Sequence, residues 1–494
     1  MKISYKYLMI AAGISVFTIS CRRELLTPIP QTSVSDASSF STPSRVSGQL
    51  LSLYGTMKSG NFYGGRYVIN GDIRGEDFIN QTNNLITGSD VWALNPTNSA
   101  TAVVNLWAQV YTTINDCNIF LEGMAKGGST VVGATLAANY IAEAKLIRAV
   151  SYYSLLQFYA RPYADGNGSK LGVPLRLTGI KAPGSSDLVR STVADVYTQI
   201  LKDLNDAETG LPLTYGTGSA TNTTRAHRNT AIALKTRVYL TMQKYAETIT
   251  EANKIVSASA PFSAASGVPH SLQANIANVF TTYTTSESIF SMPMTNTTGD
   301  YPGTQNQLGY YFSPPSSLGG VGNGEFALND AGIVSDPGWS LTDARRTNFV
   351  LKTGSGAAAR SWVTKYKSGG NYLDYVPVIR YAEVLLNLAE AKVRSSNSID
   401  AQAVALLNAV RNRSDATTTF TVASFATAAE LINAILKERR IEFLGEGLRN
   451  TDLMRLLQAI PAKGTAQTKA PADVGYIWPI PASELSLNKL AVDN

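Results

Sequence analysis

Cysteine and histidine are scarce in this 494-residue sequence, which contains two of each. A pair of cysteines cannot build a disulfide framework of the kind that holds small secreted domains together. Cys117 falls in a helical apolar pattern, so we expect a small buried side chain there. His227 and His270 stand in unrelated segments, without a cysteine or acidic ligand pattern beside them. The sequence therefore predicts neither a histidine-built metal site nor a histidine-based catalytic centre.

The motifs of common enzyme classes are missing as well. No G-x-S-x-G nucleophile motif occurs, and the glycine-rich residues 216–218 and 322–324 lack the lysine of a phosphate loop. The formal net charge is +6 without a dense run of Lys and Arg, which excludes a typical nucleic-acid-binding protein. We expect a protein that is not an enzyme and uses no cofactor. A structural Ca²⁺ in the loops stays an open alternative.

Long hydrophobic runs are also lacking. The apolar run at residues 8–19 is shorter than the roughly 20 residues that span a membrane, and it predicts a signal peptide over residues 1–20. A small residue precedes Cys21, which indicates a bacterial lipoprotein site with the lipid on Cys21, although Thr18 stands where leucine is usual. The polar, proline-bearing residues 21–43 would then be a tether.

Apolar residues at helical spacing are frequent, because 44% of the residues are hydrophobic and only 16% are charged. This composition allows a sizeable core and makes global disorder implausible. The pattern predicts helices over residues 44–58, 102–124, 136–159, 192–207, 226–242 and 246–257, from 377 onward, and over 401–413 and 430–457.

The last of these stretches, residues 430–457, predicts one helix with an acidic stripe. Glu438, Glu442 and Glu446 fall four residues apart, and like charges at this spacing repel each other. We therefore expect cations against the stripe, some of them from other parts of the fold. Two arginines within the stretch lie three residues from a glutamate, Arg439 and Arg449. A carboxylate metal site in a helical bundle would need a Glu-x-x-His pair, which is missing, so we predict a structural salt network.

Two regions lack apolar residues at helical spacing. Residues 60–98 and 261–370 are rich in Gly, Asn, Ser and Thr and carry many aromatic residues. Short alternating segments at residues 288–293 and 360–367 predict strands. A structureless loop of over a hundred residues is unusual, so we interpret the second region as a loop-rich inserted subdomain, and such regions often carry function.

The composition of these loops predicts recognition of a neutral polar ligand such as a sugar. Flat rings cover the C–H faces of a sugar, while Asn, Arg and backbone groups bond its hydroxyl groups. We predict ligand contacts at Trp92, Asn95, Arg74, Tyr310, Tyr311 and Trp339. The alternative for each ring is that it anchors a long loop to the helices.

Several linked motifs give the chain a family resemblance. The segments EAKLIRAVSYYSLLQFYARPY (143–163), VPVIRYAEVLLNLAEAKVR (376–394), ILKERRIEFLGEGLRNTDLMRL (435–456) and WPIP (478–481) follow one another in order. Together they resemble the SusD/RagB family, the outer-membrane nutrient-binding lipoproteins of Bacteroidetes. The customary terminal NPGY of that family is absent.

The resemblance implies a mainly α fold, with a tetratricopeptide-like helical scaffold and a loop-rich insertion with short strands. It implies that residues 44–260 form the N-terminal SusD-like helical region. Residues 261–370 would form the ligand-facing insertion, and residues 371–494 the C-terminal signature region.

The resemblance also implies a function. The protein would be a lipid-anchored, cell-surface glycan-binding protein of the outer membrane that delivers oligosaccharide to a SusC-like TonB-dependent transporter. Some relatives take peptides, which stay the main alternative ligand; a structural or adhesive surface subunit and a hydrolase are further alternatives. Arg22 and Arg23 follow Cys21, where surface-displayed lipoproteins often carry acidic residues, so the choice between the surface and the periplasmic face stays open.

Overall fold

The computed structural model describes residues 38–494 except 183, 185–186, 298 and 372. The predicted signal peptide, the predicted lipidation site Cys21 and most of the tether lie outside the described residues. In the part of the chain that the structure describes, no helix is both long and apolar enough to cross a membrane.

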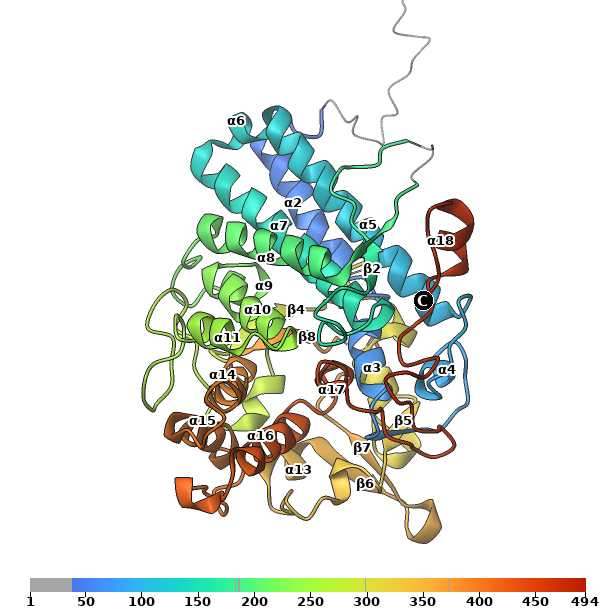
Figure 1. The fold of residues 1–494 in the computed structure, drawn as a ribbon, viewed down its shortest axis with the longest axis vertical. Helices are drawn as coiled ribbons and strands as arrows, with labels where there is room; N and C mark the ends of the chain where they lie inside the picture. The colour runs from blue at the N-terminus through green and yellow to red at the C-terminus, as the bar shows by residue number, and fades with distance from the viewer. Residues whose placement is uncertain (1–37, 183, 185–186, 298, 372) are drawn as a thin grey trace, which may run out of the picture.

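The predicted mainly α fold class is confirmed (Figure 1). The main helices are α2 (Pro43–Met57), α5 (Thr101–Gly123), α7 (Ala134–Tyr159), α8 (Val193–Gly210), α10 (Arg228–Thr241), α11 (Tyr245–Ala252), α14 (Tyr381–Ser396), α15 (Ala401–Asn412) and α16 (Ala428–Glu442). Shorter helices are α3 (Arg66–Ile73), α4 (Ser89–Trp92), α6 (Ser129–Val132), α9 (Thr221–Thr224), α12 (Leu308–Phe312), α13 (Ala344–Phe349), α17 (Arg449–Met454) and α18 (Ala482–Leu487).

Threonine caps define where several of these helices begin. Thr42 precedes α2, and its hydroxyl oxygen accepts a hydrogen bond from the backbone N–H of Arg45 at 3.3 Å, while Pro43 takes the first helical position. Thr192 caps α8 and Thr427 caps α16 in the same way. Each cap satisfies a backbone donor that has no partner inside the helix and contributes about 1 kcal/mol.

The main helices pack in sequence order as an array of neighbouring pairs. Helix α5 packs on α2 and α7, α7 on α8, α8 on α10, α10 on α11 and α11 on α14, which in turn packs on α15 and α16. This arrangement is the helical-repeat packing that the resemblance implied.

Buried Arg–carboxylate pairs connect helices of the array. Arg148 of α7 binds Asp203 of α8 through two hydrogen bonds of 2.8 Å. Arg237 of α10 binds Glu383 of α14 through two hydrogen bonds of 2.6 Å. Such bidentate pairs fix the distance and rotation between two helices more strictly than apolar contact does. The charged positions of the family-like motifs are therefore structural.

Within the described residues, eight short strands form three small antiparallel sheets. The strands are β1 (Phe78–Asn80), β2 (Leu171–Pro174), β3 (Arg190–Thr192), β4 (Ser288–Met292), β5 (Phe326–Leu328), β6 (Val350–Thr353), β7 (Arg360–Val363) and β8 (Val376–Arg380). The sheet orders are β1-β5-β7-β6, β2-β3 and β4-β8. Both predicted strands are confirmed as β4 and β7. The helix predicted from residue 377 begins at Tyr381, because residues 376–380 pair with β4 as a strand.

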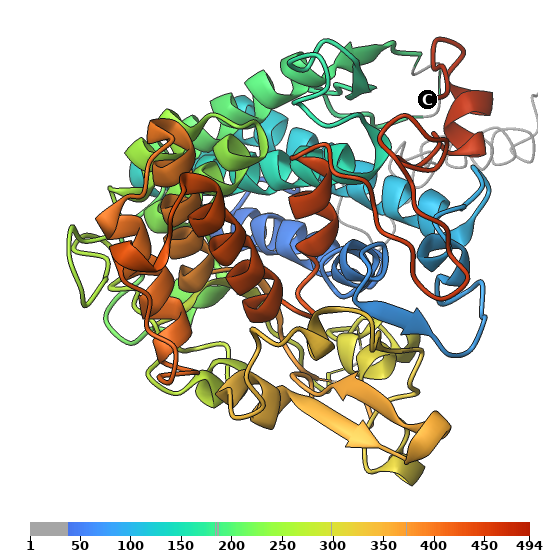
Figure 2. The same cartoon turned by 60° about the horizontal axis from the view of Figure 1, so that its bottom comes forward.

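The largest sheet joins the two loop-rich regions. Strand β1 comes from the first region and β5 from the second, and Phe78 lies opposite Leu328 in their antiparallel pairing. Figure 2 shows the blue strand of the first region beside the yellow and orange segments of the second. The second region is thus tied into the body through β1 and through the β4–β8 pair. The domain boundaries given above stay a prediction.

The prediction of a single helix over residues 430–457 is wrong. Helix α16 ends at Glu442, and α17 begins at Arg449 after a turn in which Gly445 and Gly447 have φ angles of +84° and +81°. This turn lies so close to α3 that a Cβ on Gly71 would approach the carbonyl oxygen of Gly447 to 2.2 Å. Gly447 meets both demands, because it has a left-handed backbone and a Cβ there would lie 2.7 Å from Cα of Val68, and only glycine tolerates this combination.

The acidic stripe is nevertheless neutralised by cations from other segments, as predicted. These cations are Arg345, Lys365, Arg380, Arg411 and Arg413. The carboxylate of Glu442 lies 2.6 Å from Nη1 of Arg380 and 2.9 Å from Nη1 of Arg345. Burial alone would raise the pKa of Glu442, but Arg413 and Arg380 outweigh it and hold this pKa well below its usual range.

The two arginines within the stretch bind elsewhere. Arg439 donates to the carboxylate of Asp452 at 3.1 Å, and Nε of Arg449 donates to Glu76 at 3.0 Å. Neither arginine binds the glutamate three residues away from it, because the turn after α16 redirects the chain and places other carboxylates beside them.

Candidate ligand-binding face

Two of the predicted ligand contacts, Trp92 and Arg74, are buried under the C-terminal segment. Nε1 of Trp92 donates to the carbonyl of Phe78 at 2.7 Å, and Gly464 packs against the ring. Arg74 is fully buried, donates to the carbonyl of Tyr476 at 2.6 Å, and has its pKa lowered to about 10 by burial. In this structure these two side chains hold segments together and offer no face to a ligand.

Two further predicted contacts, Tyr311 and Trp339, are buried as well. The Tyr311 hydroxyl donates to the carbonyl of Gln305 at 2.9 Å, and burial raises its pKa. The ring of Trp339 is covered by the guanidinium of Arg346, 5.1 Å from the ring centroid. Both rings anchor loops to the body, which is the alternative stated above for each ring.

The remaining predicted contacts reach the surface at different places. Asn95 is exposed and lines a cleft of about 480 Å³ that it shares with Arg161 and residues 472–475 near the C-terminus. Tyr310 is half-buried and lies at the junction of the two loop-rich regions. The structure therefore does not bring the six predicted residues together into one site.

A different set of residues surrounds Tyr310. Arg66, at the start of α3, donates from Nη1 to the carbonyl of Ile86 at 2.8 Å and from Nε to Asn306 at 3.0 Å. Its guanidinium lies 5.0 Å from the ring centroid of Tyr311, next to Tyr310. Burial lowers the pKa of Arg66. One half-buried arginine thus holds the first loop region against the aromatic pair of the second.

A buried carboxylate provides the second connection between the regions. Glu325 is 1% exposed and accepts hydrogen bonds from the Thr87 hydroxyl at 2.7 Å and from the Asn323 amide at 2.6 Å. Thr82 also donates to it. Charge-assisted hydrogen bonds of this kind are stronger than neutral ones, so the junction is rigid before any ligand arrives.

We call the exposed part of this junction the loop face, which comprises Asn83, Leu85, Ile86, Tyr310 and Asn323. Leu85 and Ile86 are 66% and 57% exposed, and Asn83 and Asn323 are also exposed. The backbone N–H of Asn323 donates to the carbonyl of Tyr310 at 2.9 Å, which holds the two residues together. A half-exposed ring, two aliphatic side chains and two amides are thus exposed on segments that Arg66 and Glu325 connect.

The sequence prediction missed most of the loop face, because it searched the loops for aromatic residues. Residues 81–88 contain none. The available signal was an apolar pair, Leu85 and Ile86, directly after two asparagines in an otherwise polar loop. Asn83 adopts a left-handed backbone with φ of +51°, which asparagine tolerates better than most residues.

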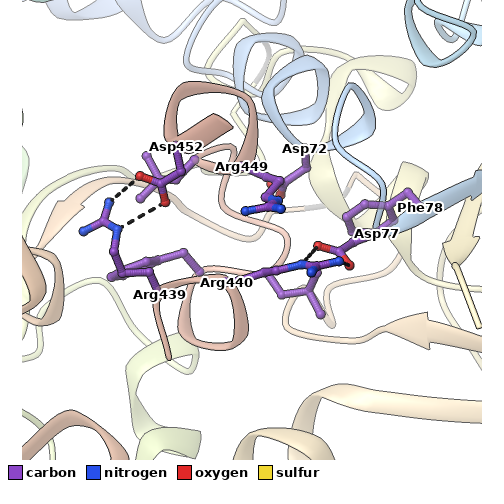
Figure 3. Close-up of a pocket in the computed structure, with 10 residues that line it drawn as sticks. Asp72, Asp77, Phe78, Arg439, Arg440, Arg449 and Asp452 are labelled. Carbon is purple, nitrogen blue, oxygen red and sulfur yellow. Dashed lines mark hydrogen bonds and ion pairs between the residues drawn. The ribbon is translucent and has the colours of Figure 1, made fainter. Parts of the chain in front are cut away.

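Charged residues also line a small cavity beside α17. Asp72, Asp77, Arg439, Arg440 and Asp452 line it, as Figure 3 shows. Its volume of about 10 Å³ suffices at most for one water molecule. Its arginines are paired, with Arg439 bound to Asp452 and Arg440 to Asp77, and Asp72 accepts a hydrogen bond from the backbone N–H of Gly447 at 3.0 Å. This cluster is a structural contact between α16 and the first loop region.

The two histidines, distant in sequence, stack on each other in the core. Their ring centroids lie 5.2 Å apart, and both side chains are fully buried. Burial lowers the pKa of His227 to about 3 and that of His270 to about 4, so both imidazoles are neutral at physiological pH. Within the described residues, no group of three or more His, Cys, Asp or Glu side chains is arranged to hold a metal ion.

Comparison with known proteins agrees with this architecture. Residues 338–494 match the SusD family, and residues 36–240 match a family described as starch-binding and associating with the outer membrane. A SusD superfamily protein of Bacteroides fragilis is 32% identical, with a TM-score of 0.79, and the match covers 92% of this chain and 99% of that chain. A SusD-like protein of Formosa agariphila is 23% identical over 539 residues, 97% of this chain and 96% of the relative.

The chain therefore belongs to the SusD/RagB family, and the resemblance stated from its motifs is confirmed. A laminarin-binding SusD-like protein shares the fold, with a TM-score of 0.69 at 21% identity over 92% of this chain and 99% of that one. The matched family description associates such proteins with the outer membrane.

Proposed function

We propose that this protein captures oligosaccharides at the loop face and holds them without cleaving them. The single observation that carries the proposal is the junction of the two loop-rich regions, where a half-exposed Tyr310, two exposed aliphatic side chains and two exposed amides lie on segments that Arg66 and Glu325 connect. Membership of a family with starch-binding members and the fold shared with a laminarin-binding protein support a glycan as the ligand.

The chemistry of the loop face suits a sugar. The ring of Tyr310 and the side chains of Leu85 and Ile86 can cover the C–H face of a pyranose, while the amides of Asn83 and Asn323 can exchange hydrogen bonds with its hydroxyl groups. Arg66 and Glu325 lie beneath these groups and are already bonded to the protein, so little conformational entropy is lost on binding.

A panel of soluble polysaccharides and peptides tests this proposal. We expect slower migration of the purified protein in native gels that contain a recognised polysaccharide, with laminarin as the first probe. Unchanged migration with every polysaccharide, together with saturable binding of a peptide in calorimetry, would show that the ligand is a peptide and contradict the proposed glycan. Binding of neither class would favour the structural or adhesive alternative.

We also propose that a lipid on Cys21 anchors the protein in the outer membrane. The lipoprotein pattern before Cys21 supports this anchor, and the matched family description supports the location. The variant Cys21→Ala is expected to lose incorporated radiolabelled palmitate and to move from the membrane fraction to the soluble fraction. Palmitate labelling of the variant equal to that of the wild type would contradict the anchor.

The captured glycan would pass to a SusC-like TonB-dependent transporter. In this proposal residues 60–98 and 261–370 carry the ligand, while the helices of residues 44–260 and 371–494 carry the contacts to the partner. Uptake of labelled oligosaccharide by cells that lack this protein should fall, although the transporter is still present. Equal uptake with and without the protein would contradict a role in delivery.

A further inference from the structure

A pocket of about 490 Å³ is bordered by α16, the end of α15 and the segment that connects these two helices. We call it the α16 pocket, and the side chains that characterise it are Arg411, Phe420, Phe425, Glu430, Asn433 and Lys437. Its volume falls within the range of about 300–1,000 Å³ that is usual for small-molecule sites. A molecule of one or two rings therefore fits into it.

The α16 pocket and the loop face lie on different parts of the molecule. In Figure 1, α15 and α16 lie at the lower left of the view, whereas α4 and β5, which are near the loop face in the sequence, lie at the right. The described residues that line the pocket all fall within 337–340 and 411–437, outside the loop face. A ligand in this pocket is therefore held by residues that the proposed function does not use.

Helix α16 presents one side to the pocket. The residues of this helix that line it are Glu430, Asn433, Ala434 and Lys437. Side chains three or four positions apart lie on the same side of a helix. Three of them, Glu430, Asn433 and Lys437, are exposed. The helix thus brings a carboxylate, an amide and an ammonium group to the rim of the pocket.

The segment between α15 and α16 adds two phenylalanine rings. Asn408 of α15 fixes Phe420, because its amide donates to the Phe420 carbonyl at 2.7 Å and its oxygen accepts from the Phe420 N–H at 2.9 Å. The centroids of the Phe420 and Phe425 rings lie 5.3 Å apart. Phe420 is half-buried and Phe425 is buried. An apolar wall is thus in place before any ligand arrives, which reduces the entropy lost on binding.

Arg411 supplies a buried hydrogen-bond donor to the pocket. This residue is 5% exposed, and its Nη1 donates to Glu438 at 3.0 Å while its Nη2 donates to the carbonyl of Gly338 at 3.1 Å. Within the described residues, its Nε has no hydrogen-bond partner. A buried donor of this kind is usually satisfied by an ordered water molecule or by a ligand. An oxygen atom of a bound molecule can accept this hydrogen bond, because Arg411 lines the pocket.

The charges at the pocket disfavour an anionic ligand. Lys437 binds Asp336 at 3.0 Å, and Arg411 binds Glu438 at 3.0 Å and Asp415 at 3.2 Å. Both cations thus have carboxylate partners, so these groups offer little net positive charge to a phosphate or a carboxylate. A purely apolar side chain is also a poor ligand, since it would leave Nε of Arg411 without an acceptor.

We infer that the α16 pocket is a second sugar-binding site, which takes a neutral mono- or disaccharide. The two phenylalanine rings pack against C–H groups of the sugar, and Nε of Arg411 donates to one of its oxygen atoms. The Asn433 amide and the Glu430 carboxylate bond its hydroxyl groups. The inference goes beyond the proposed function, because it is argued from these groups alone and does not depend on the loop face.

Hydrogen–deuterium exchange of the full-length protein tests this site with glucose, maltose and laminaribiose as probes. We expect at least one of these sugars, at saturation, to slow the exchange of residues 418–425 about threefold or more. The same protection is expected in Tyr310→Ala, because Tyr310 lies outside the pocket. Unchanged exchange of residues 418–425 with all three sugars would overturn the inference. Protection of these residues by a short uncharged phenylalanine-containing peptide, and by none of the sugars, would overturn it as well.

A pair of tryptophan variants locates the binding. Asn433→Trp fills the pocket from its rim, and the matched control Ala405→Trp changes an exposed position of α15 that does not line the pocket. In calorimetric titrations of Tyr310→Ala with the protecting sugar, adding Asn433→Trp should weaken Kd about tenfold or more, while adding Ala405→Trp leaves it unchanged. Equal Kd values in the two proteins would overturn the site. Thermal unfolding checks that Asn433→Trp is folded, and the exchange measurement needs no variant of the pocket.

The same measurements separate this inference from the proposed function. Retardation of the wild type by a polysaccharide, without protection of residues 418–425 by any sugar, would overturn the α16 pocket and leave the loop face intact. Protection of residues 418–425 by a sugar, with unchanged migration in every polysaccharide gel, would contradict capture at the loop face and support the pocket.

Discussion

The helical framework and the loop face differ in how they use polar and aromatic side chains. The framework buries charge, for example Glu442 between arginines from three other segments. The loop region buries most of its large rings, among them Trp92, Tyr311 and Trp339, and exposes Tyr310 with aliphatic and amide side chains. A loop that is rich in aromatic residues therefore does not necessarily expose them, because buried aromatic side chains also anchor a long loop to the rest of the fold.

The largest expected effect comes from the buried charges of the framework. Glu442→Gln leaves three arginines without their shared carboxylate, and breaking such a buried network costs about 3–5 kcal/mol of unfolding free energy. Urea denaturation measures the loss. The matched control is Glu430→Gln, an exposed glutamate of the same helix, with an expected change within about 0.5 kcal/mol. A similar, small change in both variants would contradict the structural role of the network.

The second prediction concerns a ring of the loop region that the structure buries. Trp92→Ala removes a packed indole and its hydrogen bond to Phe78, which should cost about 3 kcal/mol of unfolding free energy. Glycan affinity of the folded variant should stay within about twofold of the wild type. A variant of unchanged stability that has lost glycan binding would show that Trp92 contacts the ligand after all.

The third prediction uses the stacked histidines to probe the core. Both imidazoles are neutral in the fold and protonate in the unfolded chain below about pH 6.5, so stability is lost as pH falls below that value. Between pH 7.5 and 5.5 the two together should contribute a loss of about 2–3 kcal/mol. This loss should be absent in the double variant His227→Phe, His270→Phe.

Other groups titrate in or near the same range, so the difference between variant and wild type is the informative quantity. Burial raises the pKa of Asp72 to about 7, which favours the fold as pH falls, but equally in both proteins. The pKa of Glu442 is held far below this window. Parallel pH profiles of the unfolding free energy in the two proteins would contradict neutral buried imidazoles.

The smallest expected effect lies at the loop face. Tyr310→Ala removes a half-exposed ring and should weaken glycan binding by about 1–2 kcal/mol, roughly five- to thirtyfold in Kd. Its unfolding free energy should change by less than about 1 kcal/mol. Calorimetric titration and urea denaturation measure the two quantities. A large loss of stability without a change in Kd would show that Tyr310 anchors a loop, as the buried rings do, and does not contact the glycan.

Local patterns predicted the framework well, because periodicity and caps are properties of neighbouring residues. The helix predicted over residues 102–124 is α5, and the one predicted over 136–159 is α7. The spacing of Glu438, Glu442 and Glu446 also predicted correctly that cations lie against the acidic stripe. The break at Gly445 was missed because it depends on the contact between Gly447 and α3, which is distant in sequence.

The candidate site was harder to predict, because burial of a loop residue depends on segments that are far away in the chain. The sequence marked Trp92 and Arg74 as surface groups, but residues 460–476 cover both. The loop face also depends on Arg66 and Glu325, whose hydrogen bonds to Asn306 and Thr87 join residues more than two hundred positions apart in the sequence. No local pattern reveals such a connection.

The most direct test of the account compares two tyrosines of the second loop-rich region. Affinity electrophoresis with the recognised polysaccharide is carried out on the wild type, on Tyr310→Ala and on Tyr283→Ala, whose ring packs on Tyr375. The account predicts retardation of the wild type and of Tyr283→Ala, and strongly reduced retardation of Tyr310→Ala. Full retardation of Tyr310→Ala, or its loss in Tyr283→Ala alone, would contradict a glycan site at the loop face.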